Sequence, residues 1–159
     1  MRTITIRRAQ AADAGMLHEA LAALSRDLGD AHRAGPDDLL RHGFGERPSF
    51  SAVLAEQDGR AIGAAVFSPV FSTIRGGPGL YVSDLWVDST IRGGGLGRRL
   101  LAAAAAEARR DWGAGFLRLA VYEDNARARA FYERLGFDAG KGEAVLTLEG
   151  DGLAALKGE

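Results

Sequence analysis

The sequence contains no cysteine among its 159 residues. This absence excludes disulfides, thiolate zinc sites and a cysteine nucleophile. No apolar run approaches the roughly 20 residues of a membrane-spanning helix, and the N-terminal stretch lacks the apolar core of a signal peptide. The formal net charge is only −1, so the basic excess typical of nucleic-acid or anionic-membrane binding is missing. We expect a cytoplasmic protein with no metal and no nucleic-acid or membrane partner.

Hydrophobic residues make up 47% of the chain, which is enough for a substantial core. A chain of this length buries roughly 70% of its unfolded surface on folding. No repeat, low-complexity tail or linker interrupts the sequence. We therefore expect one domain over residues 1–159.

Apolar and turn residues alternate in a mixed α/β pattern. Leu17, Leu21, Leu24 and Leu28 form a helical stripe, and Asp58-Gly59 indicates a two-residue hairpin turn. Residues 76–79 read as a loop. Helices are expected around the stripe at 17–28, from Pro36 to the segment at 43–45, from 96 to about 112, and from the cap at 125 to about 135, with a helical turn at 153–156. Strands are expected at 3–7, 51–57, 60–71, 80–87, 116–121 and 144–148.

A glycine-rich turn follows the apolar strand that ends at Val87. It runs Arg92-Gly-Gly-Gly-Leu-Gly-Arg98 and opens directly into an alanine-rich helix. Such a turn leaves backbone N–H groups free at a helix N-terminus, where they can bind a phosphate. The spacing fits neither G-x-G-x-x-G nor a Gly-Lys-Ser/Thr ending, which excludes the dinucleotide fingerprint and the Walker loop.

The pattern Arg92-x-x-Gly95-x-Gly97 resembles the acetyl-CoA pyrophosphate loop of the GNAT superfamily of N-acetyltransferases. The element order resembles that family over about residues 4–148. The resemblance implies an α/β fold with a central, mostly antiparallel mixed sheet of six to seven strands. About four helices flank this sheet, and its fourth and fifth strands (80–87 and 116–121) splay apart to admit the pantetheine arm of the cofactor.

The resemblance also assigns residues to acetyl-CoA, the expected cosubstrate. Backbone N–H groups of the glycine turn would hold the pyrophosphate, with Arg92 and Arg98 adding positive charge, while the main chain at 85–87 would pair with pantetheine as an added strand. Asn125 is a good N-cap and in the family contacts pantetheine. The predicted cofactor residues are Leu85, Trp86, Val87, Arg92, Gly93, Gly94, Gly95, Leu96, Gly97, Arg98, Asn125 and Ala128.

A second segment resembles the family pattern Phe-Tyr-x-x-x-Gly-Phe, matched here by Phe131, Tyr132, Gly136 and Phe137. We predict Tyr132 as the catalytic residue. A phenol, with a pKa of about 10, can protonate or hydrogen-bond the departing CoA thiolate.

The base that deprotonates the amine is left open among Asp84, Glu123, Asp124, Tyr81 and an ordered water. The histidines His18, His32 and His42 are expected at the surface, outside the catalytic machinery.

Within the superfamily, residues 81–87 and 118–121 look most like the diamine (spermidine/spermine) acetyltransferase branch. That branch usually has a Glu where this chain has Ser83. Since successive strand side chains point to opposite faces, Asp84 is not expected to replace that carboxylate. The predicted substrate residues are Tyr81, Asp84, Arg118 and Leu119.

The expected function is transfer of an acetyl group to a primary amine by direct attack in a ternary complex. A small-molecule acceptor is favoured, and a polyamine-like amine is one candidate. A protein N-terminus or lysine is the alternative acceptor. A non-catalytic acyl-CoA-binding regulatory module is the alternative from another class. Many relatives form homodimers, and a homodimer is expected here.

Overall fold

The structure is a computed structural model that describes residues 2–140 and 142–159. Two compact units divide the chain, Met1–Val121 and Tyr122–Glu159. The first unit holds the strands β1 (Thr5–Arg8), β2 (Ser51–Gln57), β3 (Arg60–Ser72), β4 (Gly77–Val87) and β5 (Leu117–Leu119), the short 3-10 helix η1 (Ala11–Asp13), and the helices α1 (Ala14–Leu28), α2 (Pro36–Phe44) and α3 (Leu96–Trp112). The second unit holds α4 (Ala126–Arg134) and α5 (Gly150–Lys157).

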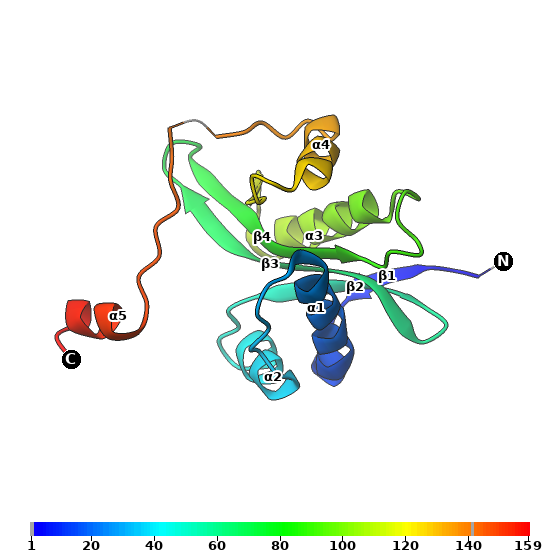
Figure 1. The fold of residues 1–159 in the computed structure, drawn as a ribbon, viewed down its shortest axis with the longest axis horizontal. Helices are drawn as coiled ribbons and strands as arrows, with labels where there is room; N and C mark the ends of the chain where they lie inside the picture. Colours follow the sequence, from blue (N-terminus) through cyan, green and yellow to red (C-terminus); the bar gives the residue numbers. More distant parts are fainter. Residues whose placement is uncertain (1, 141) are drawn as a thin grey trace. The chain divides into compact units, whose positions relative to one another are not determined.

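The first unit is built on one sheet with strand order β1-β2-β3-β4-β5. The first three strand pairs are antiparallel, and only β4 and β5 run parallel. Helices α1 and α2 cover one face of this sheet and α3 covers the other (Figure 1). The predicted GNAT arrangement is confirmed, although the described residues form five strands rather than six or seven.

The turn between β2 and β3 has the predicted geometry. Asp58 and Gly59 both adopt positive φ, 53° and 75°, as a type I′ hairpin requires. The predicted loop at 76–79 is wrong in part, because β4 already begins at Gly77 and pairs there with Ser72. Proline lacks an N–H to donate, so sequence alone does not favour a strand that includes Pro78.

The face of the sheet beneath α1 and α2 carries a buried hydrophobic cluster. Leucines of the predicted α1 stripe pack there on small residues of β2 and β3 and on Trp86 of β4. The cluster comprises Ala9, Leu17, Ala20, Leu21, Leu39, Ala52, Leu54, Ala64, Val66 and Trp86. Small side chains in the sheet let α1 lie close to it.

Helix α3 packs closely on the opposite face at Gly63 of β3. A Cβ atom at Gly63 would lie 2.8 Å from Cδ1 of Leu100 and 3.1 Å from the carbonyl oxygen of Trp86. At the other end of α3, Nε1 of Trp112 donates a hydrogen bond to the carbonyl of Gly79, at 2.9 Å. These two contacts fix α3, and with it the glycine turn that precedes it, against β3 and β4.

Pairing between β4 and β5 is short. It covers Leu80–Val82 against Leu117–Leu119, so β5 is shorter than the predicted strand at 116–121. Beyond Val82, none of the described residues pairs with β4 on this side. The edge from Ser83 to Val87 is therefore open, as expected for strands that splay apart.

The second unit begins with α4, whose N-cap is the predicted Asn125. Its side chain accepts a hydrogen bond from the N–H of Ala128, at 3.2 Å. Gly136 ends the helix with a φ of 98°, as predicted for a C′ residue.

The predicted strand at 144–148 is wrong, because this segment has no regular secondary structure. A strand requires a partner for its backbone groups, and these residues pair with none of the described strands. The predicted turn at 153–156 is instead the longer helix α5. No helix in the described part of the chain is long and apolar enough to cross a membrane.

We expect Gly63→Ala to destabilise the first unit by about 1–3 kcal/mol, since its methyl group would overlap Leu100 and the Trp86 carbonyl. Gly77→Ala is the matched control, because a Cβ at that strand position meets nothing within 4 Å. Urea unfolding of both variants measures the difference. Equal midpoints would show that α3 can retreat from the sheet without cost.

Candidate active site

The turn between β4 and α3 is held by its own side chains and by its glycines. Oδ1 of Asp88 accepts hydrogen bonds from the N–H and the hydroxyl of Thr90, at 2.9 and 2.8 Å. Gly93 and Gly95 adopt φ of 91° and 81°, a region that other residues enter at a cost. A Cβ at either glycine would meet nothing within 4 Å, so the backbone faces open space before the N-terminus of α3.

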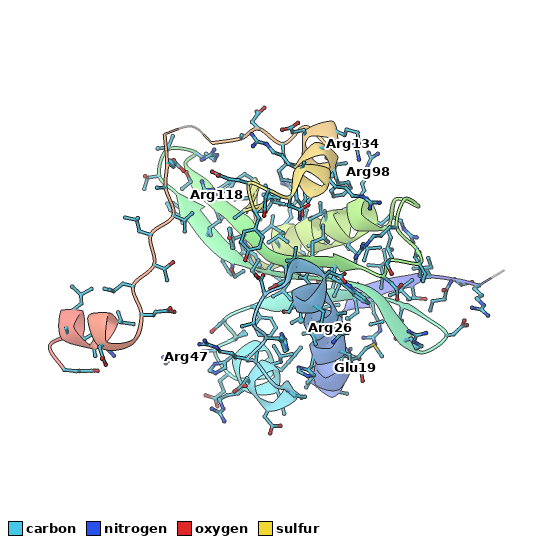
Figure 2. All side chains as sticks on the ribbon, viewed as in Figure 1. Glu19, Arg26, Arg47, Arg98, Arg118 and Arg134 are labelled. Atoms are coloured by element: carbon cyan, nitrogen blue, oxygen red, sulfur yellow. The ribbon has the colours of Figure 1, made fainter. Side chains whose placement is uncertain are left out.

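The two predicted arginines of this turn differ in their contacts. The guanidinium of Arg92 pairs with Asp27 of α1 at 2.6 Å, and its Nε donates to the carbonyl of Val87 at 3.0 Å. Arg92 therefore ties the turn to α1 and β4. Arg98, labelled in Figure 2, is exposed on the first turn of α3.

Leu85, Trp86 and Val87 lie on the open part of the β4 edge. Trp86 is buried in the cluster beneath α1, while Leu85 and Val87 are half-buried. The structure therefore supplies an unpaired strand edge next to the glycine turn. This is the geometry that an extended ligand needs in order to add as a strand.

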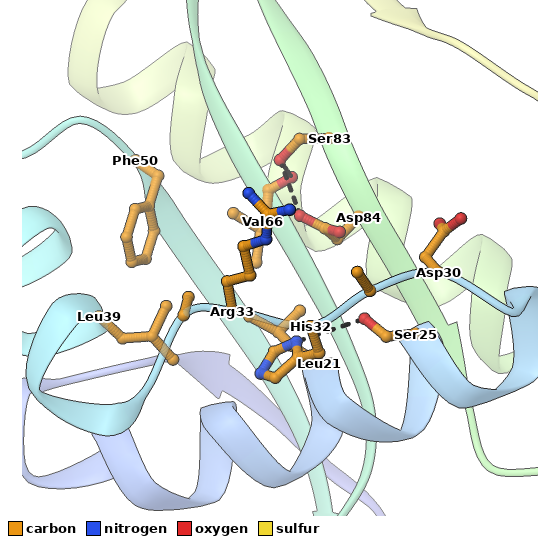
Figure 3. Close-up of a pocket in the computed structure, with 12 residues that line it drawn as sticks. Leu21, Ser25, Asp30, His32, Arg33, Leu39, Phe50, Val66, Ser83 and Asp84 are labelled. Carbon is orange, nitrogen blue, oxygen red and sulfur yellow. Dashed lines mark hydrogen bonds between the residues drawn. The ribbon is translucent and has the colours of Figure 1, made fainter. Parts of the chain in front are cut away.

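A cavity of about 420 Å³ lies between β4 and the chain that connects α1 to α2 (Figure 3). Ser83 and Asp84 of β4 line one side, and His32 and Arg33 line the other. The remaining lining residues are Leu21, Ser25, Asp30, Ala31, Ala34, Leu39, Phe50 and Val66. Of the predicted substrate residues, only Asp84 lines this cavity. The residues between α1 and α2 were not predicted, because a connecting segment has no periodicity that could indicate which of its side chains line a site.

A bulge in β4 brings Ser83 and Asp84 to the same cavity. Val66 pairs with Asp84 whereas the next residue, Phe67, pairs with Val82, so Ser83 is the extra residue. Bulges redirect side chains and are frequent next to active sites. The expectation that neighbouring side chains on this strand point to opposite faces is therefore wrong at this position: both residues line the cavity.

Asp84 is half-buried and carries a perturbed carboxyl. Burial raises its pKa above the ordinary value, and the hydroxyl of Ser83, which donates to Oδ2 at 3.0 Å, opposes the shift. His32 and Asp30 also act on this group through their charges, His32 lowering and Asp30 raising the pKa. A carboxylate in such surroundings gains from a bound cation.

His18 and His32 are half-buried, whereas His42 is exposed. Nε2 of His32 lies 3.2 Å from Nδ1 of His18, and Nδ1 of His32 lies 3.3 Å from Oγ of Ser25. Nothing in their sequence spacing indicates this pairing, since His32 lies in the segment that connects α1 to α2.

The other predicted substrate residues lie elsewhere in the first unit. Tyr81 pairs with Arg118 and Val82 with Leu119 where β4 and β5 meet. The guanidinium of Arg118 lies over the ring of Phe116, 5.3 Å from its centre. None of these three residues lines the cavity with Asp84, and their assignment to substrate stays a prediction.

In the second unit, Tyr132 packs between two aromatic rings. Their centres lie 5.2 Å (Phe131) and 5.5 Å (Phe137) from its own. Tyr132 is half-buried, and burial raises its pKa above the usual value. The phenol therefore keeps its proton at neutral pH, as a proton donor must.

In the part of the chain that the structure describes, no group of three or more His, Cys, Asp or Glu residues is placed to hold a metal ion.

We expect Asp84→Asn to raise the free energy of unfolding at neutral pH, because the amide avoids burying a charge. The pKa of Asp84 is higher in the folded state than in the unfolded state. The free energy of unfolding of the wild type therefore falls as the pH rises from the lower of these two values through the higher one. The gain should vanish below about pH 4, where the carboxyl is protonated in both states.

Urea unfolding across this pH range tests the expectation, with Asp138→Asn, an exposed carboxylate of the second unit, as the control. A variant less stable than wild type at neutral pH would show that Asp84 stabilises the fold.

The sequence was compared with family models and with known proteins. The family model described as "Acetyltransferase (GNAT) family" matches residues 17–137. The thialysine N-epsilon-acetyltransferase of Bos taurus is 28% identical over 172 residues, covering all of both chains. This relative agrees with the predicted diamine acetyltransferase-like branch.

Solved structures share the fold. An integron cassette protein of V. cholerae has a TM-score of 0.80 at 23% identity and covers 98% of each chain. An aminoglycoside N-acetyltransferase solved in complex with CoA has a TM-score of 0.75 at 19% identity, covering 94% of this chain and 96% of the other. The chain belongs to the acetyltransferase (GNAT) family and is an acetyl-CoA-dependent N-acetyltransferase.

Proposed function

We propose that the chain acetylates the primary amine of a small molecule held in the cavity between β4 and the α1–α2 connection. One observation carries this proposal: the cavity wall and the unpaired edge belong to the same strand. Ser83 and Asp84 line the cavity, and the next three residues form the open edge of the same strand. Holding two reactants side by side is worth about 7–11 kcal/mol of the barrier.

The glycine turn and the open edge fit acetyl-CoA, which supplies an acetyl thioester when bound. The turn from Gly93 to Gly97, with Leu96 and the start of α3, would offer backbone N–H groups to the pyrophosphate. Arg98 would add charge from the first turn of α3, and Arg92 would do so if it left Asp27. The main chain of Leu85–Val87 would pair with the pantetheine amides.

In the second unit we assign Asn125 and Ala128 to pantetheine and Tyr132 to the leaving group. When an amine attacks the thioester, the C–S bond breaks and the sulfur leaves as a thiolate. A phenol that holds its proton can donate it to that sulfur. The raised pKa of Tyr132 supports this role.

The charges of the cavity favour an acceptor that carries both an ammonium and an anionic group. Asp30 and Asp84 supply carboxylates and Arg33 a guanidinium. Thialysine, for which the Bos taurus relative is named, is an amino acid with a side-chain amine. An acceptor of this kind could place its ammonium by Asp84 and its carboxylate by Arg33. A polyamine would leave Arg33 without a partner.

A cytoplasmic location stays a prediction.

A homodimer is also part of the proposal, and two exposed apolar side chains support it. Val145 and Leu146 of the C-terminal segment are 88% and 91% exposed. Clustered exposed apolar side chains often mark an interaction surface.

The first test is thiol release from acetyl-CoA against a panel of amines. The panel comprises thialysine, lysine, spermidine, an aminoglycoside and a short peptide. We expect the highest kcat/KM for an amino acid with a side-chain amine. Preference for the peptide would favour a protein acceptor. Acetyl-CoA binding without release from any amine would favour a regulatory module and contradict the proposal.

We expect Tyr132→Phe to lower kcat by about 10²-fold, because general acid catalysis contributes ~10²–10⁴-fold and positioning is retained. The KM for acetyl-CoA should change little. Tyr122→Phe, at an exposed tyrosine of the same unit, is the matched control. An unchanged kcat would remove Tyr132 from the mechanism.

A further inference from the structure

The two half-buried histidines form a row of hydrogen-bonding atoms that begins at the cavity wall. Ser25 lines the cavity, and its Oγ lies 3.3 Å from Nδ1 of His32. Nε2 of His32 lies 3.2 Å from Nδ1 of His18, which in turn lies 3.1 Å from the carbonyl oxygen of Ala34. Figure 3 shows Ser25 and His32 on the cavity side opposite Asp84.

The protons of this row can be arranged in two directions, because each imidazole nitrogen can donate or accept. In one direction Ser25 donates to His32 and His32 donates to His18. The one lone pair of His18 Nδ1 then accepts from His32, and His18 offers no donor to the carbonyl of Ala34. Uptake of one proton at Ser25 reverses the row, so that Nδ1–H of His32 donates to Ser25 and Nδ1–H of His18 is shared between Nε2 of His32 and the carbonyl of Ala34. The carbonyl of Ala34 therefore gains a donor when the row accepts a proton.

We propose that the Ser25–His32–His18 row takes the proton that the acceptor ammonium must lose before it can attack. The step rests on the proposed function. An N–H bond of the ammonium breaks as Oγ of Ser25 gains that proton, and Ser25 passes its own proton to Nδ1 of His32. His32 passes its Nε2 proton to Nδ1 of His18. The amine is left neutral with a free electron pair, and His18 becomes an imidazolium.

The surroundings of the row suit this role. The other ionisable side chains lining the cavity are Asp30, Arg33 and Asp84. Asp84 and His32 line the same cavity. The carboxylate of Asp84 can hold the ammonium on one side of the cavity while Ser25 receives the proton on the other. Ser25 is then the member of the row that touches the acceptor, and His32 and His18 act through it.

The test compares two acceptors that differ in basicity, ethylamine and trifluoroethylamine. Ethylamine is an ammonium at neutral pH and must lose a proton, whereas trifluoroethylamine is already largely neutral. We expect Ser25→Ala and His32→Asn to lower kcat/KM for ethylamine by about 10²-fold. Both variants should leave kcat/KM for trifluoroethylamine within about threefold of wild type. His42→Asn, at the exposed histidine, should change neither.

The ratio of the two kcat/KM values is measured within one protein sample, so a partly misfolded variant does not distort it. An equal loss for both amines would mean that Ser25 and His32 only shape the cavity, and would overturn the proposal. Wild type that releases no thiol with any amine would instead refute the proposed function.

Discussion

Strand β4 pairs with β3 along its whole length but with β5 over only three residues, and the candidate site depends on this difference. The full pairing with β3 keeps β4 rigid where it has no second neighbour. The early end of the pairing with β5 leaves main-chain groups open directly before the glycine turn. A strand paired on both sides would have no backbone groups to offer a ligand.

Local features of the fold could be predicted from sequence because their causes lie within a few residues. The turn at Asp58-Gly59 requires two positive φ angles, and the Asn125 cap requires one side chain at one position. The α1 stripe follows from helical periodicity. The family resemblance, carried by the glycine turn and the segment around Tyr132, depends on the same kind of short-range pattern.

The features that could not be predicted arise from contacts between distant residues. The bulge at Ser83 is a property of the register between β3 and β4, and a single strand does not reveal it. The pairing of His18 with His32 depends on the path of a connecting segment. Residues 144–148 alternate like a strand but lie unpaired, because alternation shows only that a segment could pair. Each failure therefore concerns a partner rather than an intrinsic preference.

The ion pair between Arg92 and Asp27 joins the proposed phosphate site to the chain that lines the cavity. Asp27 lies near the end of α1, directly before the segment that supplies Asp30, His32 and Arg33 to the cavity. A phosphate bound as proposed would draw Arg92 away from Asp27 and so remove one contact of that helix end. The two proposed sites would then be coupled through one guanidinium, equally in both directions. Because the ion pair is exposed, the coupling would be worth no more than about 1 kcal/mol.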